Sequence, residues 1–350
     1  MLNILRAIKE HQKLLMKLVP LTAFAIPLLW LYLLEPASFE LMWKGRTFQL
    51  FFIWLVGLEL ILGWEDLQEF KIRKVFSART IALVVSLTLP TVYVAVSYFW
   101  GLNGAIFNLA TQSHIQWASS IPLSTEYLVF AVLFGAIVSL TFGFKGLKAF
   151  SVPAFFLVIV GLIYTIDNVF PYGQFTPFQI FVPTTTALAA AILNLMGYST
   201  SITYGESSLE GNMPFLTSTD PHHLNASATF SIAWPCAGIE SFLIFTVVIL
   251  LFLKRMPISW KAKISYFAFG VAITYVINAL RIVSIFTIGM QYGATSSQVD
   301  LFHFYYGPLY AVGWIVSYPL IILLGQSLWR RLKKPKPSFT EAQLPSLNPA

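Results

Sequence analysis

Long runs of hydrophobic residues alternate with short polar segments along the whole chain. A helix needs about 20 consecutive apolar residues to cross the ~30 Å hydrocarbon core of a bilayer, whereas the strands of a membrane barrel show shorter segments of alternating polarity. The long apolar runs of this chain match membrane-spanning helices and predict eight of them. They cover residues 18–34, 48–64, 80–100, 127–144, 152–169, 237–253, 264–288 and 308–329.

One further apolar segment, residues 184–198, is short for a membrane span and opens with three threonines. We expect it to form an interfacial or re-entrant helix that does not cross the membrane. Residues 199–235 contain no Lys or Arg and are expected to form an outer loop, as are residues 101–125. The predicted fold class is therefore an all-α polytopic membrane protein with about eight transmembrane helices plus one interfacial or re-entrant helix.

The chain shows no internal repeat and no separate soluble domain. We expect residues 1–350 to form a single integral membrane domain. Residues 18–183 would supply the first five helices and an outer loop, and residues 184–329 would carry the polar motifs. Residues 330–350 would form a basic, disordered cytoplasmic tail. The first helix lacks a small-residue cleavage site and is expected to be retained.

The charged residues agree with a membrane topology. Only 11% of the chain is charged, against about 25% in soluble proteins. The net charge of +7 would suit a nucleic-acid partner, but the basic residues lie mostly in short loops between apolar runs. With a cytoplasmic N-terminus, all of the 22 Lys and Arg except Lys44, Arg46 and Arg281 fall on the cytoplasmic side. We therefore predict cytoplasmic N- and C-termini and no nucleic-acid partner.

The chain contains one cysteine, Cys236, which excludes an internal disulfide framework and a multi-cysteine metal site. The motifs CxxC and HExxH and the Gly-rich phosphate loops are absent from the sequence, and the pair His222 and His223 has no third ligand at a suitable spacing. The sequence therefore predicts neither a metal nor a cofactor. Cys236 is then either a buried structural thiol or a reactive one.

The predicted topology brings three polar residues toward the outer membrane surface: Cys236 at the outer end of the sixth helix, Arg281 in the outer half of the seventh, and His303 just before the eighth. A thiol attacks a carbonyl as the thiolate, which a nearby cation favours. Arginine stays protonated in a low-dielectric setting and can stabilise a developing oxyanion. Histidine titrates near neutrality and can protonate a leaving amine. Together the three residues predict thiol-based acyl transfer at the extracytoplasmic face.

Other interpretations of these residues remain open. A lone cysteine on an apolar helix is most often a small buried hydrophobe, and an arginine near a helix end can extend toward the interface. Glu59 and Asp167, together with Arg281, lie at membrane depth and would also suit a transporter, although broken helices and repeat symmetry are not evident. A scaffolding membrane protein is the third alternative.

Three motifs resemble the signatures of the exosortase/archaeosortase family, in the same order and spacing. Residues 235–241 (PCAGIES) resemble the Cys-small-Gly-Ile-x-Ser signature, residues 278–282 (NALRI) the Asn-x-x-Arg-Ile motif, and residues 303–307 (HFYYG) the His-x-x-x-Gly motif. Many bacterial members have serine at the position of Ala237, and some archaeal members have arginine at that of His303. This mixed pattern favours the archaeal-type branch.

The resemblance implies a membrane-embedded cysteine peptidase or transpeptidase with sortase-like chemistry. By motif match, Cys236 would be the nucleophile, Arg281 its electrostatic partner and His303 the acid/base. The substrates would be surface proteins with C-terminal sorting signals, cleaved through a thioester and transferred to a membrane lipid or another acceptor. Simple intramembrane proteolysis is the alternative within the enzyme class.

Neighbouring residues are candidates for supporting roles. Gly238 and Ser241 belong to the first motif, Glu240 lies about one turn after the cysteine, and Asn278 lies nearly one turn before the arginine. The glycine permits close approach of the backbone, and we expect the amide that follows the cysteine to donate to an oxyanion. Asn225 begins a glycosylation sequon in the predicted outer loop.

Overall fold

Helices dominate the computed structural model, which describes residues 2–41, 44–65, 67, 78–170, 176–207, 211–223 and 226–332. The α-helices are α1 (Leu2–Leu34), α2 (Thr47–Leu62), α3 (Ala78–Phe99), α4 (Leu102–Gln112), α5 (Ile121–Ala149), α6 (Ser151–Val169), α7 (Thr176–Gln179), α8 (Phe181–Leu195), α9 (Glu240–Arg255), α10 (Trp260–Tyr292), α11 (Ser297–Leu301) and α12 (Gly307–Leu332). Single helical turns are η1 (Pro36–Phe39), η2 (Ala118–Ser120), η3 (Pro235–Ile239) and η4 (Phe302–Tyr306). The strands are β1 (Ser199–Ser207), β2 (Gly211–Thr219) and β3 (Ser227–Ser231).

The helices have the length and surface of membrane spans. Within the described residues, seven helical segments are long and apolar enough to cross a bilayer, and they contain α1, α3, α5, α6, α9, α10 and α12. α2 has 16 residues and is short by this measure, but it packs against α1 and α6. Large side chains such as Leu33, Val132 and Phe144 face outward, as a lipid-facing surface requires. The predicted all-α polytopic fold class is confirmed.

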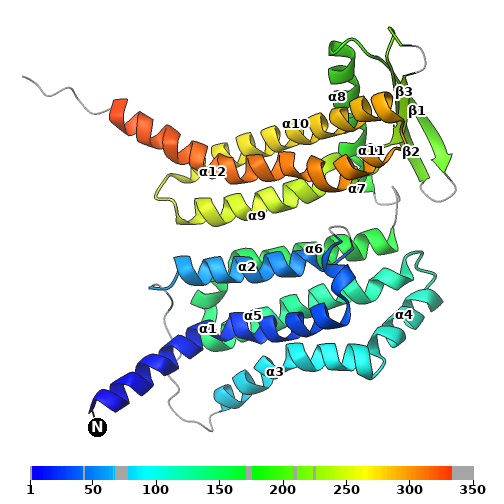
Figure 1. Cartoon of the computed structure of the whole chain (residues 1–350). Helices are drawn as coiled ribbons and strands as arrows, with labels where there is room; N and C mark the ends of the chain where they lie inside the picture. The colour runs from blue at the N-terminus through cyan, green and yellow to red at the C-terminus, as the bar shows by residue number, and fades with distance from the viewer. Residues whose placement is uncertain are drawn as a thin grey trace, which may run out of the picture.

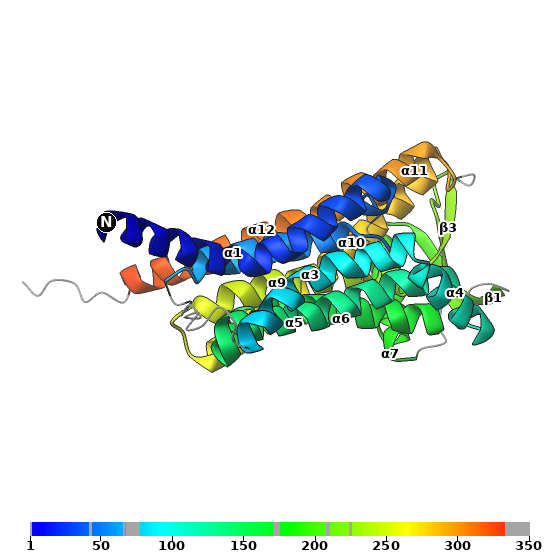
Figure 2. The same ribbon diagram turned by 90° about the horizontal axis from the view of Figure 1, so that it is seen from below.

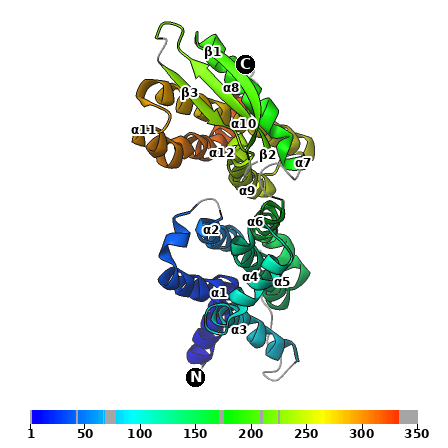
Figure 3. The ribbon, with the colours of Figure 1, turned by 90° about the vertical axis from the view of Figure 1, so that its right-hand side faces the viewer.

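Two groups of helices lie side by side (Figure 1, Figure 3). One contains α1 to α6 and the other contains α9, α10 and α12, with the sheet at one end. Buried aromatic rings fill the first group, where Phe24 meets Phe52, Phe130 and Phe134 in T-shaped contacts. Val247 of α9 belongs to the same hydrophobic core, so apolar packing joins the two groups.

Ion pairs with buried carboxylates hold both ends of α2. At its start, the guanidinium of Arg46 donates two hydrogen bonds to the carboxylate of Glu126 on α5, at 2.8 and 2.9 Å. Near its end, Glu59 accepts hydrogen bonds from Lys254 at 2.6 Å and Arg255 at 2.8 Å, both in the last turn of α9. The second cluster therefore links the two groups of helices at the end away from Arg46.

Two exceptions to the predicted charge distribution are buried and paired. Lys44 Nζ lies 2.7 Å from Asp167 Oδ2, and Arg46 is bound to Glu126. Because a neighbouring carboxylate balances each positive charge, neither cation needs to lie with the other basic residues. The start of α1 and the end of α12 lie at one end of the molecule, opposite the sheet and α11 (Figure 2). This arrangement fits termini on one side of a membrane.

Residues 199–235 form more than the predicted loop, because they contain a three-stranded antiparallel sheet in the order β1–β2–β3. Pro214, Leu216 and Ser218 of β2 are buried, and the residues between them are partly exposed. The buried side of the sheet packs against α8 and α10. Pairing of β2 with β3 ends at Phe215 and Ser231, since proline lacks the N–H group needed to extend the ladder.

Three further predictions concern segments between the spans. α8 lies crosswise to α10 (Figure 1), as expected for an interfacial or re-entrant helix and not for a span. Residues 101–125 were predicted as a loop but contain α4. Residues 330–332 belong to α12 and not to a tail, because the helical pattern continues past the apolar run. Residues 333–350 and the sequon residue Asn225 lie outside the described residues.

Candidate active site

Cys236 lies in η3, a single π-helical turn that leads into α9. Gly238 breaks the turn with φ +98°, a conformation that residues with a Cβ rarely adopt. A Cβ at this position would lie 2.8 Å from Cγ of Asn278 on α10. The close approach allows the Asn278 side-chain amide to donate a hydrogen bond of 3.0 Å to the Cys236 carbonyl. These contacts explain the glycine of the first motif and the asparagine of the second.

His303 lies in a second π-helical turn, η4, which leads into α12. Such turns are rare and occur frequently at functional sites. Arg281 reaches this turn from α10, and its Nη2 donates a hydrogen bond of 3.1 Å to the His303 carbonyl. A Cβ at Gly307 would lie 2.8 Å from Arg281 Nε. The glycine of the third motif therefore leaves room for the arginine of the second.

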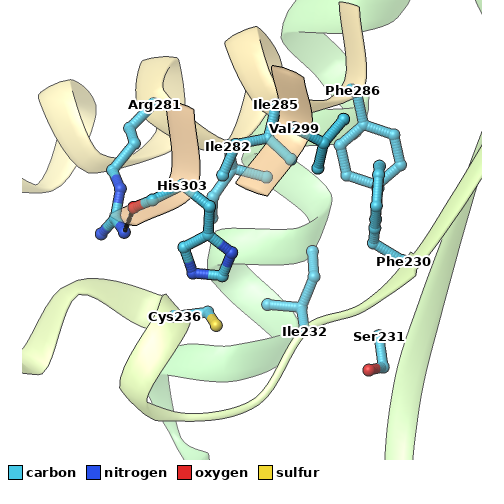
Figure 4. A pocket seen from close by; sticks show the side chains of 10 residues that line it. All are labelled: Phe230, Ser231, Ile232, Cys236, Arg281, Ile282, Ile285, Phe286, Val299 and His303. Carbon is cyan, nitrogen blue, oxygen red and sulfur yellow. Dashed lines mark hydrogen bonds between the residues drawn. The ribbon is translucent and has the colours of Figure 1, made fainter. Parts of the chain in front are cut away.

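One pocket brings the three predicted catalytic residues together (Figure 4). Cys236, Arg281 and His303 line it, and the thiol and the imidazole face the same space. All three are partly buried. The remaining lining residues are mostly apolar: Phe230, Ser231, Ile232, Ile282, Ile285, Phe286 and Val299. The pocket volume of ≈ 80 Å³ suits a small chemical group, such as an acyl carbon with its substituents.

The supporting residues lie behind this pocket and do not line it. Gly238 and Asn278 shape the cysteine turn. Glu240 and Ser241 are partly buried in the first turn of α9. Neither Glu240 nor Ser241 lines the pocket with Arg281. Among the described residues, no group of three His, Cys, Asp or Glu side chains is arranged to hold a metal ion.

The amide expected to donate to an oxyanion is already occupied. The Ala237 N–H donates to the carbonyls of Ala233 at 3.2 Å and Trp234 at 3.1 Å. The prediction for this amide is therefore wrong, because the turn that carries the cysteine uses the group for its own hydrogen bonds. Arg281 is the cation that remains beside the pocket, and its Nε has no hydrogen-bond partner among the described residues.

The carboxylates that suggested a transporter have structural partners. Glu59 is bound to Lys254 and Arg255. Asp167 accepts a hydrogen bond of 3.0 Å from the indole N–H of Trp234 and pairs with Lys44. Neither carboxylate lines the pocket with Arg281. The three charged groups proposed for transport therefore do not meet in one pocket.

The contact between Asp167 and Trp234 was not anticipated from the sequence. Trp234 is fully buried and lies two residues before the cysteine. Asp167 belongs to α6, and its ion-pair partner Lys44 is also close to Trp117, with Nζ 3.1 Å from the ring centroid. Trp234 thus connects the first group of helices to the turn that carries Cys236. Its only sequence signal is its position directly before the first motif.

Replacement of Asp167 by asparagine is expected to destabilise the protein by about 3 kcal/mol, because it leaves the charge of Lys44 buried without its partner. Both side chains are less than a tenth exposed. The double variant Asp167→Asn with Lys44→Met should regain most of the loss, since no buried charge remains. Thermal unfolding in detergent micelles measures both effects. A double variant as unstable as the single one would contradict this account of the pair.

Replacement of Gly238 by alanine is expected to lower activity at least about tenfold, through a strained φ and a displaced Asn278. Gly293→Ala is a matched control, because Gly293 has φ +96° and a Cβ added there would have nothing within 4 Å. Initial rates of substrate cleavage, compared at equal folded protein, measure the difference. Equal activity of the two variants would show that the close approach at Gly238 is unimportant for the site.

Comparison with known proteins agrees with the motifs. The sequence model of the family described as transmembrane exosortase matches residues 43–322. The match covers most of the chain, including α2 to α6, where the short motifs gave no information. It also includes Cys236, Arg281 and His303. No curated protein and no solved structure matches the chain.

Proposed function

Because this chain belongs to the transmembrane exosortase family, whose members are membrane transpeptidases that act on C-terminal sorting signals, we propose that it cleaves such signals through Cys236. The observation that carries the proposal is the shared pocket of Cys236, Arg281 and His303. A thiol, an imidazole and a permanent cation around one apolar space are the groups that acyl transfer requires.

The proposed reaction has two halves. The Cys236 thiol passes its proton to His303, and the sulfur attacks the scissile carbonyl, whose negative oxygen is stabilised by Arg281. His303 returns the proton to the leaving amine, and the carbon–nitrogen bond breaks to leave a thioester. An acceptor then enters, gives its proton to His303 and displaces the thiolate. A membrane lipid as acceptor gives transfer, and water gives hydrolysis.

The proposed location follows from charge and from the position of the pocket. We place both termini in the cytoplasm, on the basic side of the chain, and the pocket near the extracytoplasmic face, next to the sheet. The single integral unit would meet its substrate within the bilayer. Confinement of enzyme and substrate to one membrane raises their effective concentration, which suits a signal that carries its own hydrophobic helix.

Mass analysis of the product tests the proposed function. Membranes that contain the protein are supplied with a C-terminally anchored surface protein from the same genome, and matched membranes without the protein serve as the control. Transfer gives a new C-terminus with the added mass of a lipid, whereas simple proteolysis gives a free carboxylate. An unchanged surface protein in both membranes would overturn the proposal.

A further inference from the structure

β3 has a free edge. Among the described residues, β2 is its only strand neighbour. In an antiparallel pair, successive residues point their backbone N–H and C=O groups alternately toward and away from the partner. The Ile232 N–H donates to Pro214 on β2 at 3.0 Å, so the backbone groups two and four residues earlier also point toward β2. Those of Ser231 and Thr229 therefore point toward the free edge.

The pocket of Cys236 runs along this edge. Phe230, Ser231 and Ile232 all line it, although successive side chains of a strand point to opposite faces. Phe230 and Ser231 are successive residues of β3 and point to opposite faces, and Ile232 directly follows the strand, so the pocket borders the edge at the end of β3 (Figure 4). His303 lines the same pocket. An extended chain beside β3 would therefore lead directly to the thiol and the imidazole.

β3 also lacks the residue types that often prevent pairing at an edge. Edge strands normally carry lysine, proline or a bulge that prevents the addition of another strand. β3 has the sequence Ser-Ala-Thr-Phe-Ser, and Ser227 and Thr229 are exposed. Accessible backbone groups without such protection are suited to binding an extended peptide.

We propose that the sorting signal binds by strand addition to the free edge of β3. The extended residues just before its scissile bond would pair with this edge and place the scissile carbonyl beside Cys236. This inference rests on the proposed function and adds the mode of substrate recognition. Backbone pairing supplies affinity, and the apolar pocket wall selects side chains. The paired segment stays attached in the thioester, so it would hold the acyl group while the membrane helix leaves.

A proline at Thr229 tests the pairing, because it removes an N–H group that points to the free edge and not to β2. We expect Thr229→Pro to lower kcat/KM at least about tenfold, mainly by raising KM. Thr229→Ala removes the hydroxyl, which contacts Thr217 at 2.9 Å, and keeps the N–H group. It should therefore behave like the wild type.

A proline on the opposite edge of the sheet is the matched control. The backbone groups of successive β2 residues point alternately toward β3 and toward β1. Those of Pro214 point toward β3, so those of Phe215 and Thr217 point toward β1. The backbone groups of their partners, Thr203 and Ser201, therefore point toward β2. The backbone groups of Ile202 between them point to the free edge of β1. Ile202→Pro should leave cleavage unchanged. A Thr229→Pro variant with the kcat/KM of Ile202→Pro would overturn strand addition.

A second measurement uses the wild-type protein and therefore does not depend on the folding of a variant. The probe is a synthetic peptide that spans the sorting motif and hydrophobic segment of a surface protein from the same genome, with one backbone nitrogen methylated at a time. Strand addition predicts that methylation before the scissile bond impairs cleavage at every second position. Equal effects at adjacent positions would overturn it. No cleavage of the unmodified peptide would instead overturn the proposed function.

Discussion

Replacement of Cys236 by alanine or serine is expected to lower substrate cleavage by at least about 10⁴-fold, the loss typical of removing a nucleophile. Alanine has no nucleophilic atom. Serine has a hydroxyl group that ionises far less readily than a thiol, so it is a much weaker nucleophile in the same pocket. The turn itself should persist in both variants, because Gly238 and Asn278 hold it through the backbone.

The measurement compares initial cleavage rates at equal amounts of folded protein in the membrane. Extraction in mild detergent and gel filtration show whether each variant has inserted and folded. Normal cleavage by both variants would show that the reaction does not use the thiol. The protein could then be a transporter or a scaffold as well as an enzyme.

Replacement of Arg281 by glutamine is expected to lower kcat by about 10²–10³-fold, the range found when one oxyanion donor is removed. The expectation is strengthened by the occupied amide of Ala237, which leaves the guanidinium as the donor beside the pocket. Arg281→Lys should recover part of the loss, because it keeps the charge but not the planar fork that binds the His303 carbonyl. KM should change little in either variant.

Arg255→Gln is the control for Arg281. Arg255, the last residue of α9, is partly exposed like Arg281, and it contacts Glu59 away from the pocket. Its loss should lower stability and leave kcat within about threefold of the wild type. Steady-state kinetics at several substrate concentrations separate kcat from KM. A kcat for Arg281→Gln equal to that for Arg255→Gln would contradict an electrostatic role of Arg281 in the reaction.

The long helices and the three candidate catalytic residues could be predicted from the sequence, since both depend on local patterns. Spans are recognised by the length of their apolar runs. Cys236 and His303 lie just before two of the last three spans, and Arg281 lies in the outer half of the span between them. Their meeting in one pocket follows once those helices are adjacent. The family match extends the prediction to earlier helices, whose sequences carry hydrophobicity but no motif.

The sheet and the polar contacts between helices could not be predicted in the same way. β2 contains Pro214 in its interior, which argues against a central strand, and Ser and Thr dominate its neighbours. The Asp167–Trp234 contact joins residues 67 positions apart, and no local pattern identifies such a pair. The amide of Ala237 was misjudged because its N–H group already donates to the carbonyls of Ala233 and Trp234, four and three residues earlier.

The central claim is that Cys236 forms a covalent acyl bond with the substrate, and trapping with hydroxylamine tests it most directly. Hydroxylamine attacks a thioester and leaves a hydroxamate at the new C-terminus of the substrate, which mass spectrometry identifies. The account predicts a hydroxamate product whose yield rises with hydroxylamine concentration and disappears in Cys236→Ala. Cleavage that continues at the same rate and gives only the free carboxylate at every hydroxylamine concentration would contradict it.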